Sequence, residues 1–451
     1  MKKNEIVSIT IILVAVALYW FDLYSKVLGL NSAQEASFTI MIIAATLWVT
    51  EAVPLFVTSF IIVELQVLWL MPELNALGVS SKLQDYLSPF FSNIILLFLG
   101  GFTLSSALHK YRLDIRIARL ILLKIGSDPS KVMLAIIMIC AFLSMWMSNT
   151  ATAAMMFTVV FPIIQKMPER SLFAKGLTLS IPFACNLGGI GTPIGTPPNA
   201  IAISLLANSG ITISFLTWMI LAVPLMITGL FVLWRILLAL FPPNGEKVEL
   251  DIEIKDGIQS EQYLIIGVFI VTALLWLTAD LHKVPLGIVS TIPITMFFGL
   301  RILSNDDFRT LSWHVLFMLG GGLSLGYGIA ASGLAKLFIE MIPVGIEAWA
   351  IFAGFALFGM ILSTFISNTA AANLLIPALV SLDEHRFMIV IGVAIACSIA
   401  MALPVSTPPN AIAFGSGIIK SKDMLISGSI VSIVLLLLTM IVALSYWQFI
   451  F

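Results

Sequence analysis

The stretch Ser148-Asn149-Thr150-Ala151 places small and polar residues in the middle of a long apolar segment, and the sequence uses it twice. The second copy runs from Ser367 to Ala370 and begins 219 residues later. Each copy is followed by the same run, Thr-Pro-Pro-Asn-Ala-Ile-Ala. The first run lies within Gly195 to Ala202 and the second within Ser406 to Ala413, 211 residues later. The repetition of both motifs in the same order indicates a duplicated chain.

A third pair of landmarks precedes the first two. Phe98 to Gly101 matches Met318 to Gly321 at an offset of 220 residues. Paired polar breaks in corresponding apolar segments of two halves are typical of a transport site at the interface between inverted repeats. We therefore expect two repeats that share one site near the middle of a membrane.

The composition assigns the chain to the membrane proteins. Hydrophobic residues make up 60% of the sequence, charged residues 10%, and the mean hydropathy is +1.08, whereas soluble domains carry about 25% charged residues. Repeated apolar stretches of about 20 residues are long enough to cross a bilayer as helices and do not show the alternation of a membrane barrel. The sequence predicts an all-α polytopic protein. The net charge of -1 gives no reason to expect nucleic acid as a partner.

The apolar segments predict about eleven transmembrane helices and two re-entrant hairpins. An apolar run of about 34 residues with a polar tip suits two short helices better than one long helix. The start of the chain resembles a signal peptide but lacks a small-residue cleavage site, so we interpret it as an uncleaved span. The sequence predicts a first transmembrane helix at 1–24. Repeat 1 follows at 36–241, with a hairpin at 132–165 and a broken helix at 174–207. After a cytoplasmic linker at 242–261, repeat 2 covers 262–450, with a hairpin at 348–382 and a broken helix at 387–419.

The distribution of lysine and arginine predicts the orientation. With the N-terminus in the cytoplasm and the segment 110–131 as a cytoplasmic loop, 18 of the 23 basic residues fall on the cytoplasmic side, as the positive-inside rule requires. Five spans per repeat would invert the second repeat relative to the first. The sequence thus predicts a plasma-membrane protein whose hairpins enter from opposite faces. The acidic linker is interpreted as a solvated connector.

The segments around the landmarks contain no ionisable acid or base. No Lys, Arg, His, Asp or Glu occurs at 133–165, 176–234 or 348–382. A site there must bind with amides, hydroxyls and the groups freed where a helix breaks, whose N-termini suit anions and whose C-termini suit cations. Pro-Pro pairs enforce such breaks because proline cannot donate an interior hydrogen bond. The residues alone favour a carrier for a small anion or cation.

Catalysis is not expected. No nucleophile with an adjacent base is visible, and His109, His282, His314 and His385 all fall near the ends of predicted spans. Cys140, Cys185 and Cys397 lie inside apolar segments, so we interpret them as packing residues rather than as disulfide partners or metal ligands.

The doubled Ser-Asn-Thr and Thr-Pro-Pro-Asn motifs closely resemble those of the divalent anion/sodium symporter (DASS) family of dicarboxylate, citrate and sulfate carriers. The resemblance covers nearly the whole chain, including Leu97 to Gly101 and Leu143 to Trp146. It implies a homodimer with a fixed scaffold domain and a transport domain that moves by an elevator mechanism.

The resemblance also implies two kinds of site. The residues implied for substrate binding are Ser148, Asn149, Thr150, Thr196, Pro197, Ser367, Asn368, Thr369, Thr407 and Pro408. Two sodium sites are implied, the first at Ser144, Ser148, Asn149 and Gly195 and the second at Ser363, Ile366, Asn368 and Ser406.

The second sodium site departs from the family pattern. Many sodium-coupled members carry Thr-Glu five and four residues before the second asparagine, whereas this chain has Ser363-Thr364. A dianion bound without basic side chains is costly to desolvate, and bound cations would compensate for that cost. We expect sodium-coupled symport of four-carbon dicarboxylates such as succinate, malate and fumarate. A sodium-independent dicarboxylate exchanger and a sulfate or citrate carrier of the same fold remain alternatives, as does a membrane receptor that binds without transport.

The inverted arrangement predicts a labelling pattern. Single cysteines placed at Ser148 and at Ser367 should react with a membrane-impermeant thiol reagent from opposite sides of oriented vesicles. Access from the same side would contradict the inverted repeat.

Overall fold

A computed structural model describes residues 3–168, 170–249, 257, 259–340, 345–382 and 386–449. All regular structure within these ranges is helical, so the prediction of an all-α fold is confirmed. Three of the six acidic residues of the predicted linker, Asp251, Glu253 and Asp256, lie outside the described residues, as does His385. The chain forms two compact units: unit 1 comprises 1–95, 200–212 and 312–397, and unit 2 comprises 96–199, 213–311 and 398–451.

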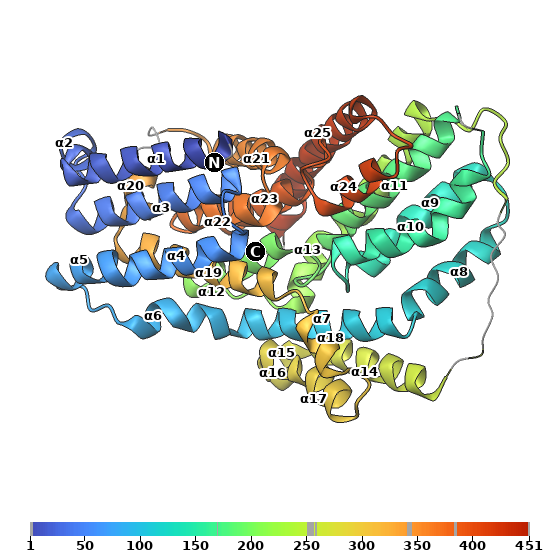
Figure 1. Cartoon of the computed structure of the whole chain (residues 1–451), viewed down its shortest axis with the longest axis horizontal. Coiled ribbons are helices and arrows are strands. Elements are labelled where there is room, and N and C mark those ends of the chain that lie inside the picture. The colour runs from blue at the N-terminus through green and yellow to red at the C-terminus, as the bar shows by residue number, and fades with distance from the viewer. Residues whose placement is uncertain are drawn as a thin grey trace. The chain divides into compact units, whose positions relative to one another are not determined.

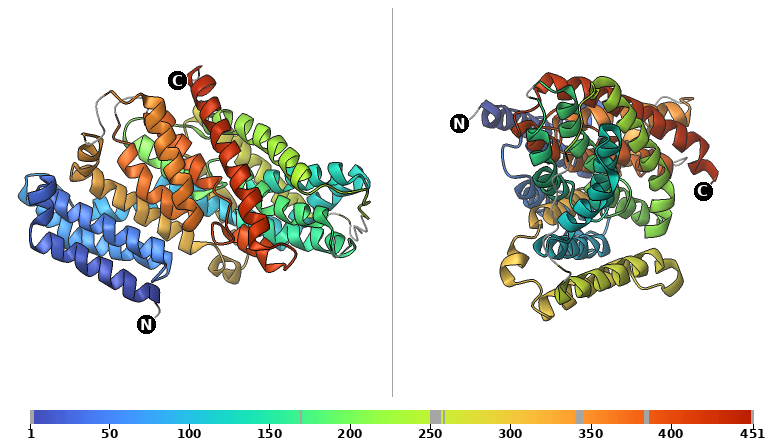
Figure 2. Two further views of the ribbon diagram at one scale, coloured as in Figure 1. Left: turned by 90° about the horizontal axis from the view of Figure 1, so that it is seen from above. Right: turned by 90° about the vertical axis from the view of Figure 1, so that its right-hand side faces the viewer.

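Unit 1 combines the first helices of the chain with helices from its second half. In the views of Figure 2, α1 and α3 lie side by side, and α3 packs in turn on α4. The helices of unit 1 are α1 (Lys3–Trp20), α2 (Leu23–Leu28), α3 (Ser32–Thr50), α4 (Leu55–Leu65), the π-helical turn η1 (Gln66–Leu70), α5 (Met71–Ala76), α6 (Leu83–Leu87), η2 (Ser88–Phe91), α19 (Trp313–Ala331), α20 (Leu334–Glu340), α21 (Ala348–Phe365) and α22 (Asn368–Leu379).

Helix α19 forms the centre of unit 1 because its glycines admit two neighbours. A Cβ at Gly321 would lie 2.2 Å from Cβ of Ser59 on α4, and a Cβ at Gly322 would lie 1.8 Å from Oδ1 of Asn373 on α22. Only glycine allows helices to approach this closely. The Leu-Gly-Gly landmark of the second repeat is therefore a packing surface for α4 and α22.

Unit 2 holds the middle of the chain and its C-terminal end. Helices α7, α12 and α23 each cross from one unit to the other. These three and the helices of unit 2 are α7 (Asn93–Lys110), α8 (Leu113–Ile125), α9 (Pro129–Ser144), α10 (Asn149–Gln165), α11 (Leu172–Gly189), α12 (Pro197–Asn208), α13 (Phe215–Leu240), α14 (Ser260–Leu277), α15 (Ala279–His282), α16 (Leu286–Val289), α17 (Thr291–Gly299), α18 (Asn305–Arg309), α23 (Arg386–Ser398), α24 (Pro408–Gly415), α25 (Ser421–Ser445) and η3 (Trp447–Phe449).

Helix α11 is the most enclosed helix of unit 2. It packs against α9, α10, α13 and α24 (Figure 1), and its residues from Gly176 to Gly189 include none that is exposed. The absence of a side chain at Gly188 brings α11 against the backbone of Ala141 on α9. The chain that leads into the first Thr-Pro-Pro-Asn break is thus held from several sides.

Several helices are long and apolar enough to cross a membrane. Within the described residues there are eight such helices, and shorter apolar helices accompany them. The count of eleven spans and the re-entrant course of the two paired stretches stay predictions. The eight are Ser32–Thr50, Leu55–Ala76, Leu83–Lys110, Phe215–Leu240, Ser260–Leu277, Asn305–Ala331, Ala348–Phe365 and Ser421–Ser445.

The segment 110–131, predicted as a cytoplasmic connection between spans, contains a helix in its central part, and its place on the cytoplasmic side stays a prediction. Residues Leu113–Ile125 form the 13-residue helix α8. The basic residues that suggested a loop alternate with apolar ones, and Leu113, Ala118 and Leu122 are buried. The buried Asp114 also binds His109, with Nδ1 2.8 Å from Oδ2. An amphipathic helix accounts for both the charges and the apolar spacing.

The contact between α9 and α11 predicts a sensitive glycine. In Gly188→Ala the new Cβ would lie 2.4 Å from the backbone of Ala141, which cannot rotate away. We expect a loss of about 1–3 kcal/mol in the free energy of unfolding, as for other overpacked cores. The measurement is the thermal midpoint of the purified protein in detergent. Gly267→Ala on α14, where nothing lies within 4 Å of the new Cβ, is the control, and equal midpoints for the two variants would contradict the account.

Candidate functional site

The first Ser-Asn-Thr motif lies where one helix ends and the next begins. Helix α9 ends at Ser144, and α10 starts at Asn149. Ser148 is the N-cap of α10, and its hydroxyl accepts a hydrogen bond from the backbone N–H of Ala151 at 3.2 Å. Serine is favoured here because its side chain satisfies one of the free N–H groups of the first turn. The other free donors of this N-terminus provide partial positive charge without any basic residue.

Oxygen atoms converge on the side chain of Asn149. One terminal atom of its amide lies 2.6 Å from Oγ of Ser144, 3.2 Å from the carbonyl oxygen of Cys185 and 3.3 Å from that of Gly195. The amide nitrogen is the atom that satisfies these partners, since an amide oxygen there would face only acceptors. With the amide nitrogen there, Asn149 donates to the same carbonyls. The hydroxyl of Ser144 and the carbonyls of Cys185 and Gly195 thus gather at one uncharged point.

This cluster joins three of the four residues implied for the first sodium site. Ser144, Asn149 and Gly195 meet, whereas the hydroxyl of Ser148 is engaged in the helix cap. The missing side chain of Gly189 makes room, since a Cβ there would lie 2.7 Å from Oδ1 of Asn149. The hydroxyl of Ser144 and the two main-chain carbonyls are oxygen ligands of the kind that unwound transporter segments offer to Na⁺.

The second Ser-Asn-Thr motif, in unit 1, repeats this arrangement. Helix α21 ends at Phe365 and α22 starts at Asn368. Ser367 is the N-cap, accepting from Ala370 N–H at 3.2 Å. Oγ of Ser363 lies 2.8 Å from Oδ1 of Asn368 and 2.7 Å from the carbonyl oxygen of Cys397.

The two clusters correspond residue by residue. Each has a buried serine five residues before the asparagine and a cysteine carbonyl. Of the other residues implied for the second sodium site, Ile366 is extended and buried between the two helices, and Ser406 belongs to unit 2.

The residue that departs from the family pattern lies beside this cluster. The hydroxyl of Thr364 donates to the carbonyl oxygen of Met360 at 2.8 Å, within its own helix. Ser363, which occupies the position equivalent to Ser144, makes the contact with the asparagine. The second cluster is thus formed without an acidic residue, as the first is.

The two Thr-Pro-Pro-Asn breaks are held by their asparagines. Nδ2 of Asn199 donates to the carbonyl oxygens of Gly189 at 3.0 Å and Thr192 at 2.8 Å. Nδ2 of Asn410 donates to those of Met401 at 3.1 Å and Leu403 at 3.0 Å. Both asparagines are fully buried. Each amide fastens a non-helical segment to the helix that follows it, so both breaks are fixed in the same way.

The substrate-binding residues implied for the breaks lie at helix starts. Pro197 and Pro408 begin α12 and α24, where proline is tolerated because its missing N–H would have no intrahelical partner. Thr407 is the N-cap of α24, and Nδ2 of Asn186 on α11 donates to its Oγ1 at 3.2 Å. Thr196, the equivalent of Thr407, is buried directly before α12.

Unit 2 brings the first motif and both breaks together, because α10 and α11 both pack against α24. Thr150 and Pro408 are exposed, whereas Ser148 and Asn149 are half-buried. Ser367, Asn368 and Thr369 belong to unit 1.

Sequence reasoning missed the two cysteine carbonyls and Asn186. Cys185 and Cys397 were interpreted as packing residues, which describes their buried thiols but not their main-chain oxygens. The two cysteines are 212 residues apart, and the two Thr-Pro-Pro-Asn copies are 211 residues apart. This similar spacing could have indicated that the cysteines hold equivalent places in the two repeats.

Helices that restart at capped, uncharged breaks, with carbonyl oxygens converging beside them, define a class: a secondary transporter of the membrane. The chain belongs to the DASS family, because the family described as the sodium:sulfate symporter transmembrane region matches residues 3–451. The family and the relatives below are transporters, which confirms the prediction that the protein is not an enzyme.

The relatives come from bacteria and fungi. The sodium-dependent dicarboxylate transporter SdcS of Staphylococcus saprophyticus is 31% identical over 439 residues, covering 87% of this chain and 83% of that protein. The uncharacterized transporter C3B8.04c of Schizosaccharomyces pombe is 32% identical over 454 residues, covering 95% of this chain and 51% of that protein. The inorganic phosphate transporter PHO87 of Saccharomyces cerevisiae is 29% identical over 403 residues, covering 86% of this chain and 43% of that protein. The chain therefore spans about half the length of the two fungal relatives or less.

Solved structures share the fold at low identity. The YdaH transporter of Alcanivorax borkumensis matches with a TM-score of 0.55 and 12% identity, covering 81% of this chain and 87% of that one. MtrF of Neisseria gonorrhoeae matches with a TM-score of 0.54 and 12% identity, covering 81% and 83%. At this identity the likeness concerns the fold alone.

The asparagines of the breaks generate a prediction. Asn199→Ala and Asn410→Ala each leave two buried carbonyls without these donors, and each should lower the free energy of unfolding by about 1–3 kcal/mol. The measurement is thermal unfolding in detergent. Asn208→Ala, at the exposed end of α12, is the matched control. Midpoints like that of the control would show that the breaks do not depend on these amides.

Proposed function

We propose that the protein is a sodium-coupled symporter of four-carbon dicarboxylates such as succinate, malate and fumarate. One observation carries the proposal: at both Ser-Asn-Thr motifs a buried serine, the asparagine and a cysteine carbonyl lie together without any charged group. They are Ser144, Asn149 and Cys185 in one repeat and Ser363, Asn368 and Cys397 in the other. The name of the SdcS relative, a sodium-dependent dicarboxylate transporter, supports the same conclusion.

The substrate dianion is held by neutral donors in this proposal. In unit 2 the N-terminus of α10 presents free backbone N–H groups beside Asn149 and Thr150, and those of α12 and α24 do so beside the Thr-Pro pairs. In unit 1 the N-terminus of α22 does so beside Asn368 and Thr369. Helix N-termini bind anions because N–H dipoles point at the ligand. Neutral donors alone leave a dianion poorly compensated away from water.

Two co-transported sodium ions supply the missing positive charge. Ser144, Asn149 and the carbonyls of Cys185 and Gly195 would hold the first. Ser363, Asn368 and the carbonyl of Cys397 would hold the second, together with Ile366 and Ser406 as the family resemblance implies. Each ion would reduce the cost of removing the dianion from water, so ion and substrate would bind cooperatively.

The sodium-independent exchanger is the second candidate, and Ser363-Thr364 is the observation that favours it. The pattern of many sodium-coupled members has an acidic residue where this chain has Thr364. Symport is preferred because the first cluster also contains no acidic residue. The second cluster has the same three components, a serine, an asparagine and a cysteine carbonyl, so the lack of an acid does not set it apart. Sulfate, phosphate and citrate remain candidate substrates, since amides and hydroxyls bind anions but do not discriminate between them by the length of the carbon chain.

The wider transport cycle is part of the proposal. The resemblance implies a homodimer in which a transport domain moves by an elevator mechanism against a fixed scaffold. The bias of basic residues supports a multi-pass protein of the plasma membrane with a cytoplasmic N-terminus.

The decisive assay is uptake of radiolabelled succinate into proteoliposomes. The expected result is accumulation in empty vesicles driven by an inward sodium gradient. Uptake that requires internal dicarboxylate and ignores sodium would make the protein an exchanger. If succinate is not taken up in any condition, labelled sulfate, phosphate and citrate are tested next. An anion that binds but does not accumulate would indicate a receptor instead of a transporter.

The two asparagines give a mutational prediction. Asn149→Ala and Asn368→Ala each remove a side chain shared by substrate and ion, and each should lower initial uptake by about tenfold or more, as expected for lost hydrogen bonds to charged groups. The variants should remain folded, and uptake is normalised to the amount of folded protein in the vesicles. Wild-type uptake in both variants would disprove the site assignment, and Asn208→Ala serves as the control.

A further inference from the structure

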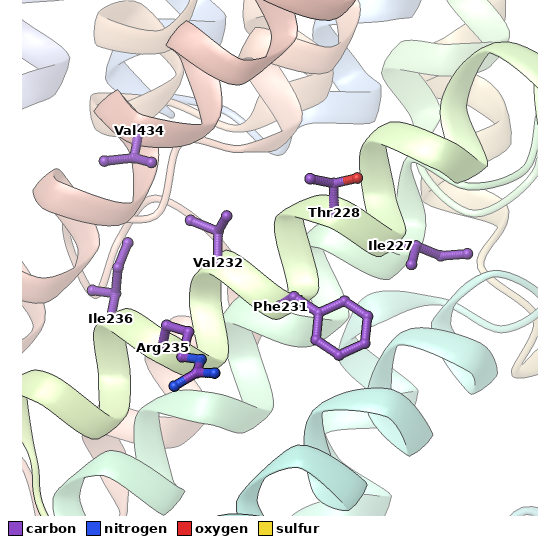
Figure 3. A pocket seen from close by; sticks show the side chains of 7 residues that line it. All are labelled: Ile227, Thr228, Phe231, Val232, Arg235, Ile236 and Val434. Atoms are coloured by element: carbon purple, nitrogen blue, oxygen red, sulfur yellow. The ribbon is translucent and has the colours of Figure 1, made fainter.

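An open groove lies between α13 and α25 of unit 2 (Figure 3). Its volume is about 610 Å³. Six of the seven lining residues come from one face of α13, and Val434 comes from α25. The lining residues are Ile227, Thr228, Phe231, Val232, Arg235, Ile236 and Val434.

The groove is apolar and faces outward. Phe231 is 45% exposed and Ile227 39% exposed. The neighbouring Ile433 and Leu437 of α25 are also more than half exposed. Both helices are apolar enough to cross a membrane, so such side chains face lipid rather than water. An acyl chain is the apolar partner that a bilayer supplies to this groove.

Arg235 is the one charged residue of the groove. It is exposed, and no salt bridge joins it to any residue that the structure describes. Its Cζ lies 4.8 Å from the centroid of the Trp234 ring, a cation–π distance. Nε1 of Trp234 donates to the carbonyl oxygen of Ser130 at 3.0 Å, which fixes the indole. The guanidinium is thus positioned beside the groove without a counter-charge.

The position of Arg235 along α13 places it near the membrane surface. It lies five residues before the end of the helix at Leu240, or roughly 8 Å along the axis. The chain then leaves the helix through Pro242-Pro243. An arginine at this depth reaches the headgroup level by extending its side chain, and tryptophan is typical of the same level.

The same end of the helix pair is basic on α25. The two helices run antiparallel, since Tyr446 and Trp447 at the end of α25 donate to the carbonyls of Ile220 and Leu221 near the start of α13. The start of α25 is therefore at the Arg235 end, with Lys420 at its N-cap and Lys422 in its first turn. Asp423 of the same turn is paired with Lys175 at 2.9 Å. Basic clusters beside transmembrane helices attract anionic headgroups.

We propose that this groove is a binding site for an anionic phospholipid, with an acyl chain along Phe231 and Val232 and the phosphate on the guanidinium of Arg235. Arginine binds phosphate oxygens through two parallel N–H groups, which a lysine cannot do. An unpaired arginine in a membrane-spanning helix is costly, and the lipid phosphate supplies its counter-charge. The surrounding lysines favour a headgroup with net negative charge over a zwitterionic one.

The test measures the thermal midpoint of the full-length protein in neutral detergent with added phosphatidylglycerol or phosphatidylcholine. The wild type should be stabilised more by phosphatidylglycerol. Arg235→Gln should weaken the apparent affinity for phosphatidylglycerol by about fivefold, and Arg235→Lys should restore part of it. Phe231→Ala should weaken binding of both lipids.

Two control variants make the result specific. Lys247→Gln removes an exposed charge at the same end of the unit, outside the groove, and Ile441→Ala truncates an exposed apolar residue of α25, also outside it. Both should respond to lipid as the wild type does. Equal stabilisation by the two lipids, or an equal loss in Arg235→Gln and Lys247→Gln, would overturn the proposal. A change from dimer to monomer in Phe231→Ala, with lipid affinity unchanged, would show that a second copy of the chain occupies the groove.

Discussion

The structure depends on one requirement: the main-chain carbonyl oxygens at its uncharged helix breaks need polar partners. A carbonyl freed from a helix inside a membrane must find a donor, a cation or the water of a cavity, because lipid offers it no partner. In unit 2 the oxygens of Cys185 and Gly195 meet at the side chain of Asn149. In unit 1 the oxygen of Cys397 meets Ser363, which also contacts Asn368. Binding of sodium at these points would satisfy oxygens that the fold has already gathered.

The rest of the chain holds these breaks in place. Asn199 and Asn410 tie each non-helical segment to the following helix. The close approach of Gly188 to Ala141 fixes α11, which leads into the first break. Serine caps start α10 and α22 in the same geometry, with ψ near 140° at both Ser148 and Ser367. Rigid breaks keep the oxygen atoms preorganised, so little reorganisation accompanies binding.

Much of this was predictable from the sequence because it depends on side-chain type. The duplicated motifs located both breaks, and the missing charges predicted an uncharged site. The α8 helix was missed because its basic residues were counted as loop residues while the helical spacing of Leu113, Ala118 and Leu122 was overlooked. The carbonyls of Cys185 and Cys397 were missed for another reason, since a sequence pattern reports side chains and not the direction of the backbone. The pairing of Asn186 with Thr407 required the packing of α11 on α24, which no local pattern specifies.

The central claim is that sodium ions held by these oxygen atoms compensate the charge of the bound dianion. The most direct measurement is the affinity of the purified protein for succinate across a series of sodium concentrations, with choline keeping the ionic strength constant. The affinity is expected to rise steeply with the sodium concentration, and Ser144→Ala and Ser363→Ala should each make this dependence shallower. An affinity that is the same with and without sodium would contradict this claim.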